Sequence, residues 1–291
     1  MSANLRGITF MISAMAMFTL SDLFLKLAAR SYSAPEIMLV MGLIGGALFG
    51  TLARINALPL FGAAFFAPTV MLRNGSELIG TFCIISALTL APLSLVTSIT
   101  QATPLVVTAG AALILRERVG LRRWLAVLAG FGGVLLILRP GVIEISWGML
   151  AALGAVMFLG LRDVITRAVP ANIHTLQLAS YSFLFLIPAG ILLIWLSPSD
   201  LTKSLRDVPW LILSILFAAA AIFAITSAMR AGEVSAIIPF RYSRMIFALI
   251  AAMLFLGERP DALTLIGVAI IIGSGLFVMR RQRQLATQKA D

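Results

Sequence analysis

Apolar residues fill this chain in long runs, and short polar or proline-containing connections separate one run from the next. Most runs reach roughly 20 residues, which is what an α-helix needs to cross the ~30 Å hydrocarbon core of a membrane. Lipid cannot solvate a peptide group, so each run is predicted to satisfy its own hydrogen bonds as a helix. The pattern predicts ten transmembrane helices, at residues 6–29, 34–52, 68–90, 93–115, 122–138, 147–168, 174–196, 208–230, 234–256 and 262–280.

The composition agrees with a membrane protein and excludes an ordinary soluble domain. Hydrophobic residues make up 60% of the chain and charged residues 12%, whereas soluble domains carry about 25% charged residues. The mean hydropathy is +1.05. The first run reaches membrane length through Asp22, so we expect it to remain as a helix rather than to be a cleaved signal peptide.

The placement of the positive charges predicts an orientation. A net charge of +10 would also fit nucleic-acid binding, but with the N-terminus inside, twelve lysines and arginines lie in cytoplasmic connections and five in outer ones. This is the positive-inside distribution of an inserted helix bundle. We therefore predict a multi-pass inner-membrane protein in contact with lipid, with both termini cytoplasmic and no nucleic-acid partner.

Two long segments of the chain repeat one another. Residues 87–139 align without a gap on residues 228–280, with 11 identities in 53 positions. The repeat keeps a Glu-Arg pair after an apolar run, at 117–118 and 258–259. A spacing of 141 residues therefore relates the two halves of the chain.

The repeated loop has diverged in charge as an inversion would require. Four basic residues and one acidic residue give +3 over 116–123, whereas one basic and two acidic residues give −1 over 257–264. Each half has five spans, and a duplicated unit with an odd number of spans must lie upside down relative to its twin. The predicted fold is all-α and integral to the membrane, with inverted five-helix repeats at 1–141 and 142–281 and a frayed cytoplasmic tail at 282–291.

Ionisable side chains inside the spans are the first functional candidates, because charge is costly in lipid. Asp22 with Lys26, and Arg73 with Glu77, have i,i+4 spacing and are predicted to meet on one helix face. Such pairs either merely permit insertion or line a polar cavity. The spans contain five basic and three acidic side chains, so they carry a surplus charge of +2, which favours a carboxylate-bearing substrate. The basic residues are Lys26, Arg73, Arg162, Arg241 and Arg244, and the acidic residues are Asp22, Glu77 and Asp163.

The ninth span is the most unusual. Pro239 precedes Arg241 and Arg244, and the matching part of the fourth span has Gln101 before Pro104. Proline-interrupted helices at corresponding places in two halves indicate a binding site. Tyr181, which shares a helix face with Gln177, adds an aromatic candidate. The predicted substrate-binding residues are Arg73, Gln101, Arg241, Tyr242, Arg244 and Tyr181, and Asp22 and Glu77 are the candidates for proton coupling.

Other residue types argue against catalysis. His174 is the single histidine and no Gly-x-Ser-x-Gly motif occurs, so nucleophilic hydrolysis lacks its residues. Cys83 stands alone, and no nucleotide-binding glycine loop is present. We therefore predict that the chain is not an enzyme and needs no cofactor or metal. Glycines in the last span of each half predict close helix packing, either within one bundle or in a homodimer; they include Gly132, Gly133, Gly267 and Gly273.

In this order, the motifs resemble the drug/metabolite transporter superfamily, specifically its ten-helix EamA-type carriers. The resemblance covers essentially the whole chain and is most specific at residues 87–94, 115–118, 124–141, 255–261 and 266–281. It implies a central cavity that opens alternately to each side and takes small organic solutes. Residues 22–26, 72–73 and 239–242 are similar to the branch that includes S-adenosylmethionine uptake carriers.

Taken together, the residues and the resemblance predict a secondary active transporter. Its substrate would be a small organic metabolite, carboxylate-bearing and amino-acid-like, which crosses the inner membrane by alternating access. The alternatives are a carrier of S-adenosylmethionine or a riboflavin-type vitamin, or a drug/metabolite exporter. A membrane scaffold that transports nothing is the alternative from a different class.

Overall fold

The computed structural model describes residues 3–62, 65–114, 121–139, 144–166, 168–170, 172–196, 207–231 and 238–287. Within these ranges all regular structure is helical and no strand occurs. The all-α prediction is therefore confirmed. Among the described residues, five stretches are each long and apolar enough to cross a membrane, namely Leu5–Ala28, Ala34–Ile55, Leu93–Gly110, Trp147–Thr166 and Leu176–Leu196.

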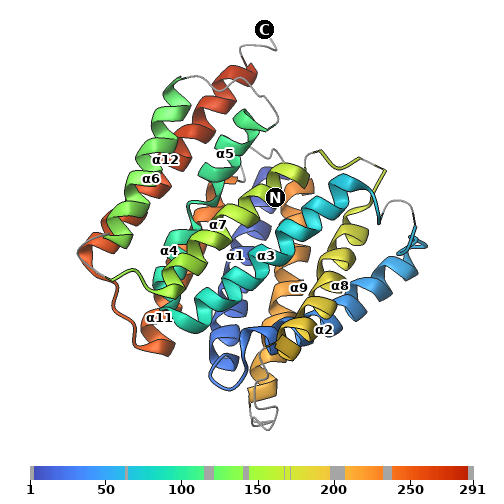
Figure 1. Cartoon of the computed structure of the whole chain (residues 1–291). Coiled ribbons are helices and arrows are strands. Elements are labelled where there is room, and N and C mark those ends of the chain that lie inside the picture. The colour runs from blue at the N-terminus through green and yellow to red at the C-terminus, as the bar shows by residue number, and fades with distance from the viewer. Residues whose placement is uncertain are drawn as a thin grey trace.

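The helices run back and forth in a single bundle (Figure 1). Those that begin at residues 34, 68, 93, 147, 208 and 262 do so at the predicted positions. The first half contains α1 (Ala3–Ala28), α2 (Ala34–Ile55), α3 (Pro68–Leu90), α4 (Leu93–Thr100), α5 (Thr103–Leu113) and α6 (Leu121–Leu138). The second half contains α7 (Trp147–Thr166), α8 (Thr175–Leu196), α9 (Val208–Ala231), the 3-10 helix η2 (Ile238–Tyr242), α11 (Ser243–Leu256) and α12 (Ala262–Thr287).

The second helix of each half begins with the same capping arrangement. Before α2, the Glu36 carboxylate accepts a hydrogen bond from the backbone N–H of Ser33 at 2.6 Å. Before α8, the amide oxygen of Gln177 accepts one from the N–H of His174 at 2.8 Å. Each side chain satisfies an N–H group that the start of a helix leaves unpaired. Both pairs of positions are 141 residues apart, so the spacing extends beyond the segment in which sequence identities reveal it.

The fourth span is broken in its middle. α4 ends at Thr100, and Pro104 lies in the first turn of α5. Proline has no N–H and its ring clashes with the carbonyl four residues earlier, so it kinks or breaks a helix at that point. In the ninth span, the 3-10 helix changes to α-helix at Tyr242, the position that corresponds to Gln101. The predicted interruptions at corresponding places are therefore confirmed.

The most extensive helix contacts join one half of the chain to the other. α1 packs along α9, α3 along α7, α2 along α8 and α6 along α12. In Figure 1, the α6–α12 pair forms the left edge of the bundle and the α2–α8 pair lies at the right. If every helix is exchanged for its counterpart, the α1–α9 pair becomes the α7–α3 pair and each edge pair maps onto itself. The set of packed pairs is thus unchanged when the two halves are exchanged.

Glycines bring the backbones of α6 and α12 into contact. A Cβ atom added at Gly133 would lie 2.7 Å from the carbonyl oxygen of Gly267, and one added at Gly267 would lie 2.7 Å from that of Gly133. Among the described residues, no atom comes within 4 Å of a Cβ built at Gly132 or Gly273. Close packing within one bundle is therefore confirmed for Gly133 and Gly267. A homodimer contact stays a prediction.

The last helix is longer than the sequence predicts. In place of a frayed tail from residue 282, α12 continues to Thr287. Residues 281–287 include arginine, glutamine, leucine and alanine but no glycine or proline, and these residue types favour a helix. Several segments that the sequence singles out lie outside the described residues, namely 115–120 with the first Glu-Arg pair, 140–141, 197–206 and 288–291.

Candidate substrate-binding site

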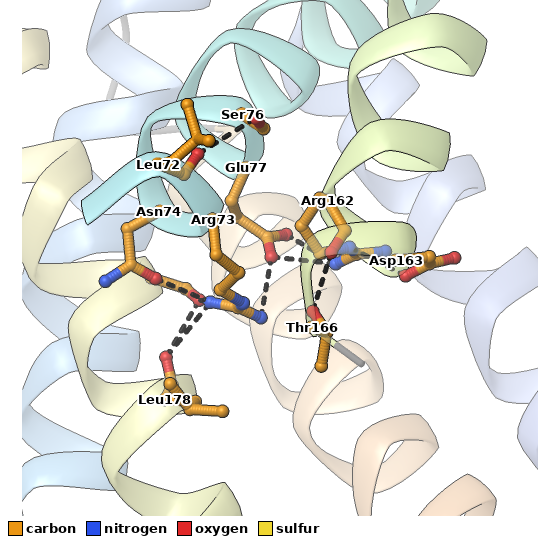
Figure 2. A network of polar contacts seen from close by, with 10 residues as sticks. Leu72, Arg73, Asn74, Ser76, Glu77, Arg162, Asp163, Thr166 and Leu178 are labelled. Carbon is orange, nitrogen blue, oxygen red and sulfur yellow. Dashed lines mark hydrogen bonds and ion pairs between the residues drawn. The ribbon is translucent and has the colours of Figure 1, made fainter. Parts of the chain in front are cut away.

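An ionic network of four side chains joins α3 to α7. Arg73 and Glu77 lie one turn apart on α3 and form the predicted pair, at 2.9 Å. Both Glu77 oxygens also accept hydrogen bonds from Nη1 of Arg162 on α7, at 2.8 and 2.7 Å. Oδ1 of Asp163 lies 2.8 Å from Nε of Arg162, and Figure 2 shows the four side chains in sequence. Two positive and two negative charges therefore neutralise one another here.

Arg73 is also held by α8. Its Nη1 group donates to Oδ1 of Asn74 at 2.7 Å, to the carbonyl oxygen of Leu178 at 3.3 Å and to the hydroxyl of Ser182. The side chain is only 10% exposed. These bonds link α3 to α8. They also occupy donors of Arg73 that a substrate would otherwise use. Its part in substrate binding stays a prediction.

Asp22 pairs across the bundle rather than within its own helix. Its Oδ2 lies 2.5 Å from Nη2 of Arg244 on α11, and the Arg244 guanidinium lies 5.2 Å from the centre of the Phe18 ring. The predicted pair between Asp22 and Lys26 does not form, so this prediction is wrong. The i,i+4 spacing shows which residues share a helix face, but an arginine from a distant segment reaches the same carboxylate.

Lys26 instead binds the C-terminal end of α3, and Glu258 binds the adjacent N-terminal end of α4. Nζ of Lys26 donates to two carbonyl oxygens at the end of α3, that of Leu88 at 3.0 Å and that of Ala91. The Glu258 carboxylate accepts hydrogen bonds from the first backbone N–H groups of α4, including that of Ser94 at 2.9 Å. Each charge opposes the partial charge of the helix end that it binds. The repeated Glu-Arg motif signals the importance of Glu258 but could not locate its partner.

A second contact at the same end of the bundle links α6 to α12. Arg139, which follows α6, pairs with Asp261, which precedes α12. The backbone N–H of Thr264 donates to Oδ1 of Asp261 at 3.0 Å. Hydrogen bonds to the charged form, first from Arg139 and then from Thr264, lower the pKa of Asp261 to about 2. This carboxylate is thus charged at any physiological pH.

Arg241 is an arginine for which the described residues provide no ion-pair partner. The surplus of two positive charges belongs to Lys26, which is bonded to carbonyl oxygens, and to Arg241. Within the described part of the chain, Arg241 forms no ion pair or hydrogen bond. Its side chain is exposed and interacts electrostatically with Asp163, Arg162 and Arg244. The binding of a substrate anion by Arg241 stays a prediction.

Two polar groups at the helix breaks also lack partners. Gln101 lies between α4 and α5 and Tyr242 at the end of η2, and both side chains are buried. Neither Nε2 of Gln101 nor the Tyr242 hydroxyl has a hydrogen-bond partner among the described residues. A buried polar group left unsatisfied costs about 1–3 kcal/mol, so such atoms mark places for water or a ligand. These two positions correspond under the 141-residue spacing.

The predicted face of Tyr181 and Gln177 packs against a connection of the chain. Tyr181 is fully buried in an apolar cluster between α3 and α8, and the Phe65 ring meets its ring edge-on at 4.9 Å. Nε2 of Gln177 donates to the carbonyl oxygen of Pro59 at 2.7 Å. Both side chains thus fix α8 to the segment between α2 and α3. Substrate contact by Tyr181 stays a prediction.

The 141-residue spacing relates two further sets of contacts that the sequence alone does not assign. Asp163 lies at the place in α7 that Asp22 has in α1. The hydroxyls of Ser21 on α1 and Ser214 on α9 lie 3.3 Å apart, at the positions that Arg162 and Arg73 have on α7 and α3. Because the spacing is visible in the amino-acid sequence, it is the signal that marks Asp163, like Asp22, as a candidate functional residue.

Known proteins are similar to this chain in sequence and in fold. The model of the EamA-like transporter family matches residues 5–139 and again residues 146–280. The riboflavin transporter of Vibrio cholerae serotype O1 is 29% identical over 195 residues, which is 63% of this chain and 63% of that protein, less than two thirds of its length. The S-adenosylmethionine uptake transporter of Rickettsia prowazekii is 25% identical over 207 residues, 70% of this chain and 69% of that protein. One solved crystal structure has the same fold, with a TM-score of 0.64 and 20% identity over 95% of this chain and 96% of its own.

These likenesses agree with what the helices and the charges indicate. The family model covers almost the whole chain in two consecutive copies. The relatives are named as transporters, and the long apolar helices suit a membrane. The chain is therefore a multi-pass integral membrane protein that belongs to the EamA-like transporter family.

Proposed function

We propose that this protein is a secondary active transporter that moves a small, carboxylate-bearing, amino-acid-like metabolite across the inner membrane by alternating access. The observation that carries the proposal is Arg241. The described part of the chain supplies no counter-ion for it, although solvent reaches it among the helices. A guanidinium binds both oxygens of a carboxylate through parallel hydrogen bonds. A carboxylate substrate would supply the missing negative charge.

The arrangement of the helices supports two inverted repeats around the site. The two copies of the family match are 141 residues apart, and the packed helix pairs are unchanged when the halves are exchanged. Five spans per half require that the second copy lie inverted. The distribution of positive charges supports a cytoplasmic location of both termini. The substrate cavity would then lie between the halves near the midplane and open to one side at a time.

Within this cavity, Arg241 binds the carboxylate of the metabolite. Gln101 and Tyr242 orient the rest of the molecule through the polar groups that lack partners. Arg73 and Arg244 are already paired with acids. They therefore bind the substrate directly only when those acids lose their charge.

Asp22 and Glu77 couple this binding to protons. A proton on Asp22 would remove the charge that holds Arg244 at 2.5 Å. A proton on Glu77 would likewise free Arg73, which lies 2.9 Å away, whereas Arg162 would keep its contact with Asp163. Either freed guanidinium attracts the substrate carboxylate more strongly. Proton and substrate binding then favour each other, and this linkage is what a proton-coupled carrier needs.

Transport of S-adenosylmethionine or riboflavin is the specific alternative, because two relatives carry those names. The chemistry of the two solutes separates them. S-adenosylmethionine contains an amino-acid carboxylate that Arg241 would bind, whereas riboflavin has no carboxylate. Binding of riboflavin should therefore be insensitive to the loss of Arg241.

Purified protein provides the test. A thermal-shift screen against amino acids, S-adenosylmethionine and riboflavin identifies ligands, since binding to the folded state raises the melting temperature. Proteoliposomes loaded with the compound that binds then exchange it for labelled compound outside. Arg241→Ala should lower the exchange of a carboxylate solute by at least about tenfold. Arg54→Ala is the matched control, because Arg54 is an exposed arginine in the last turn of α2.

Two results would count against the proposal. Carboxylate exchange at the wild-type rate by Arg241→Ala removes Arg241 from the site. An absence of flux for amino acids, S-adenosylmethionine and riboflavin alike favours the membrane scaffold. Release of a loaded solute without uptake would instead identify an exporter.

A further inference from the structure

We infer that Asp163 binds a cationic group of the substrate, so that the site takes zwitterions with an ammonium group as well as a carboxylate. This role rests on the proposed transport function and narrows its substrates to amino-acid zwitterions. Asp163 and Asp22 occupy the same place in the first span of their halves. Their surroundings nevertheless differ, and the difference leaves one of them available.

In the first half, the aspartate has its own arginine. Asp22 is paired at 2.5 Å with Arg244 from the broken ninth span. The corresponding partner for Asp163 would come from the broken fourth span, 141 residues before Arg244. The residue there is Thr103, whose hydroxyl donates to the carbonyl oxygen of Thr100 at 2.7 Å. The helix that would supply Asp163 with an arginine therefore supplies none.

Asp163 has one ion-pair partner in the described part of the chain, its neighbour Arg162. Its Oδ1 lies 2.8 Å from Nε of Arg162, and the side chain is 33% exposed, about twice the 16% of Asp22. Nη1 of Arg162 is meanwhile bonded to both oxygens of Glu77. Figure 2 shows Asp163 on the side of Arg162 that faces away from Glu77. The second oxygen of Asp163 thus has no partner among the described residues, on a side chain that solvent reaches.

Arg241 and Asp163 interact electrostatically, yet no ion pair joins them within the described residues. A simple carboxylate anion would be attracted by Arg241 and repelled by Asp163. A zwitterion suits both residues, because its carboxylate binds Arg241 while its ammonium donates to Asp163 in charge-assisted hydrogen bonds.

The test compares derivatives of each amino acid that binds. The probes are the amino acid, its N-acetyl derivative, which lacks the ammonium, and its amide, which lacks the carboxylate. Affinities come from competition and thermal-shift titrations of the purified full chain. For the wild type, we expect each derivative to bind about tenfold to a hundredfold more weakly than the parent, the range for one charge-assisted hydrogen bond.

Asp163→Asn should abolish the preference for the ammonium group and leave the preference for the carboxylate unchanged. The amino acid and its N-acetyl derivative should then bind with less than about a threefold difference, while the preference over the amide persists. Arg241→Gln should show the reverse pattern. Asp163→Glu should restore the preference for the ammonium. Glu144→Gln removes an exposed acid that precedes α7 and is the matched control.

Three outcomes overturn the role of Asp163. One is a wild-type protein that binds N-acetyl derivatives as tightly as the parents, and another is Asp163→Asn with wild-type preferences. The third is failure of every natural amino acid and of S-adenosylmethionine to bind. If riboflavin is still transported in that third case, only the role of Asp163 is overturned. If no solute is transported, both the transport function and the role of Asp163 are overturned. If Asp163→Asn fails to fold, as its melting temperature without ligand would show, the wild-type series and Asp163→Glu decide the matter.

Discussion

Glu77→Gln should lower the free energy of unfolding by about 3–5 kcal/mol, because Glu77 is the anion that two arginines share. Its carboxylate lies 2.9 Å from Arg73 and 2.7 Å from Arg162, and the side chain is 15% exposed. Glutamine keeps the size of the side chain and removes its charge. Loss of one partner from a buried ion pair typically costs about 3–5 kcal/mol, since the remaining charge is left uncompensated. Asp163 still faces Arg162, so the loss falls mainly on Arg73.

Reversible unfolding in mixed detergent micelles, followed by the loss of helicity, measures this free energy. A double-mutant cycle with Arg162→Gln isolates the pair, and the coupling energy should be at least about 1 kcal/mol because the two residues are in direct contact. Glu144→Gln is the control. It removes an exposed acid and should change stability by less than about 0.5 kcal/mol.

A loss of less than about 1 kcal/mol, with additive single and double variants, is the value expected of a solvated ion pair. That result would refute the structural role of the network between α3 and α7. Proton coupling is decided separately, from the pH dependence of transport by the same variant. If Glu77→Gln has the pH dependence of the wild type, Glu77 is not the coupling residue, whatever its effect on stability.

Three further substitutions test other contacts. Gly267→Ala should lower stability by about 1–3 kcal/mol through overpacking against α6, whereas Gly273→Ala on the same helix should be neutral; equal melting temperatures would contradict the α6–α12 contact. Because the pKa of Asp261 is lowered to about 2, the stability from its charge is present above about pH 4 and is lost as the pH falls toward 2. The melting-temperature difference between wild type and Asp261→Asn should accordingly stay constant from about pH 7 to 5 and shrink below about pH 4, and a difference that persists at the lowest pH argues against the bond. Glu258→Gln should speed hydrogen exchange of the first amides of α4, since these lose a charged acceptor; unaltered exchange would mean that the carboxylate does not hold them.

The sequence predicts the helices well because the constraints that form them are local. Lipid leaves the backbone no alternative to internal hydrogen bonds, so the length of an apolar run nearly determines a helix. The break beside Pro104 is local in the same sense, because the missing N–H acts within one turn. The end of α12 is harder to predict, since polar residues 281–287 continue a helix as readily as they fray.

Ion-pair partners depend on tertiary structure and could not be predicted in the same way. The i,i+4 rule is correct for Arg73 with Glu77 and wrong for Asp22 with Lys26, although the two pairs look alike in the sequence. What separates them is Arg244, which is 222 residues from Asp22 along the chain and beside it in the fold. Only the packing of α1 with α11 brings these two side chains together.

A carrier made of two identical halves would populate its inward-open and outward-open conformations equally, because exchanging the halves converts one into the other. Here a pair of hydroxyls, Ser21 and Ser214, lies between α1 and α9, where the corresponding α3–α7 contact holds the charged network of Glu77. If the protein alternates access as proposed, its two conformations are therefore not equivalent, and each difference of about 1.4 kcal/mol between them changes their ratio tenfold. Such a carrier, empty of substrate and proton, would rest open to one side of the membrane, and its own sequence would decide which side that is.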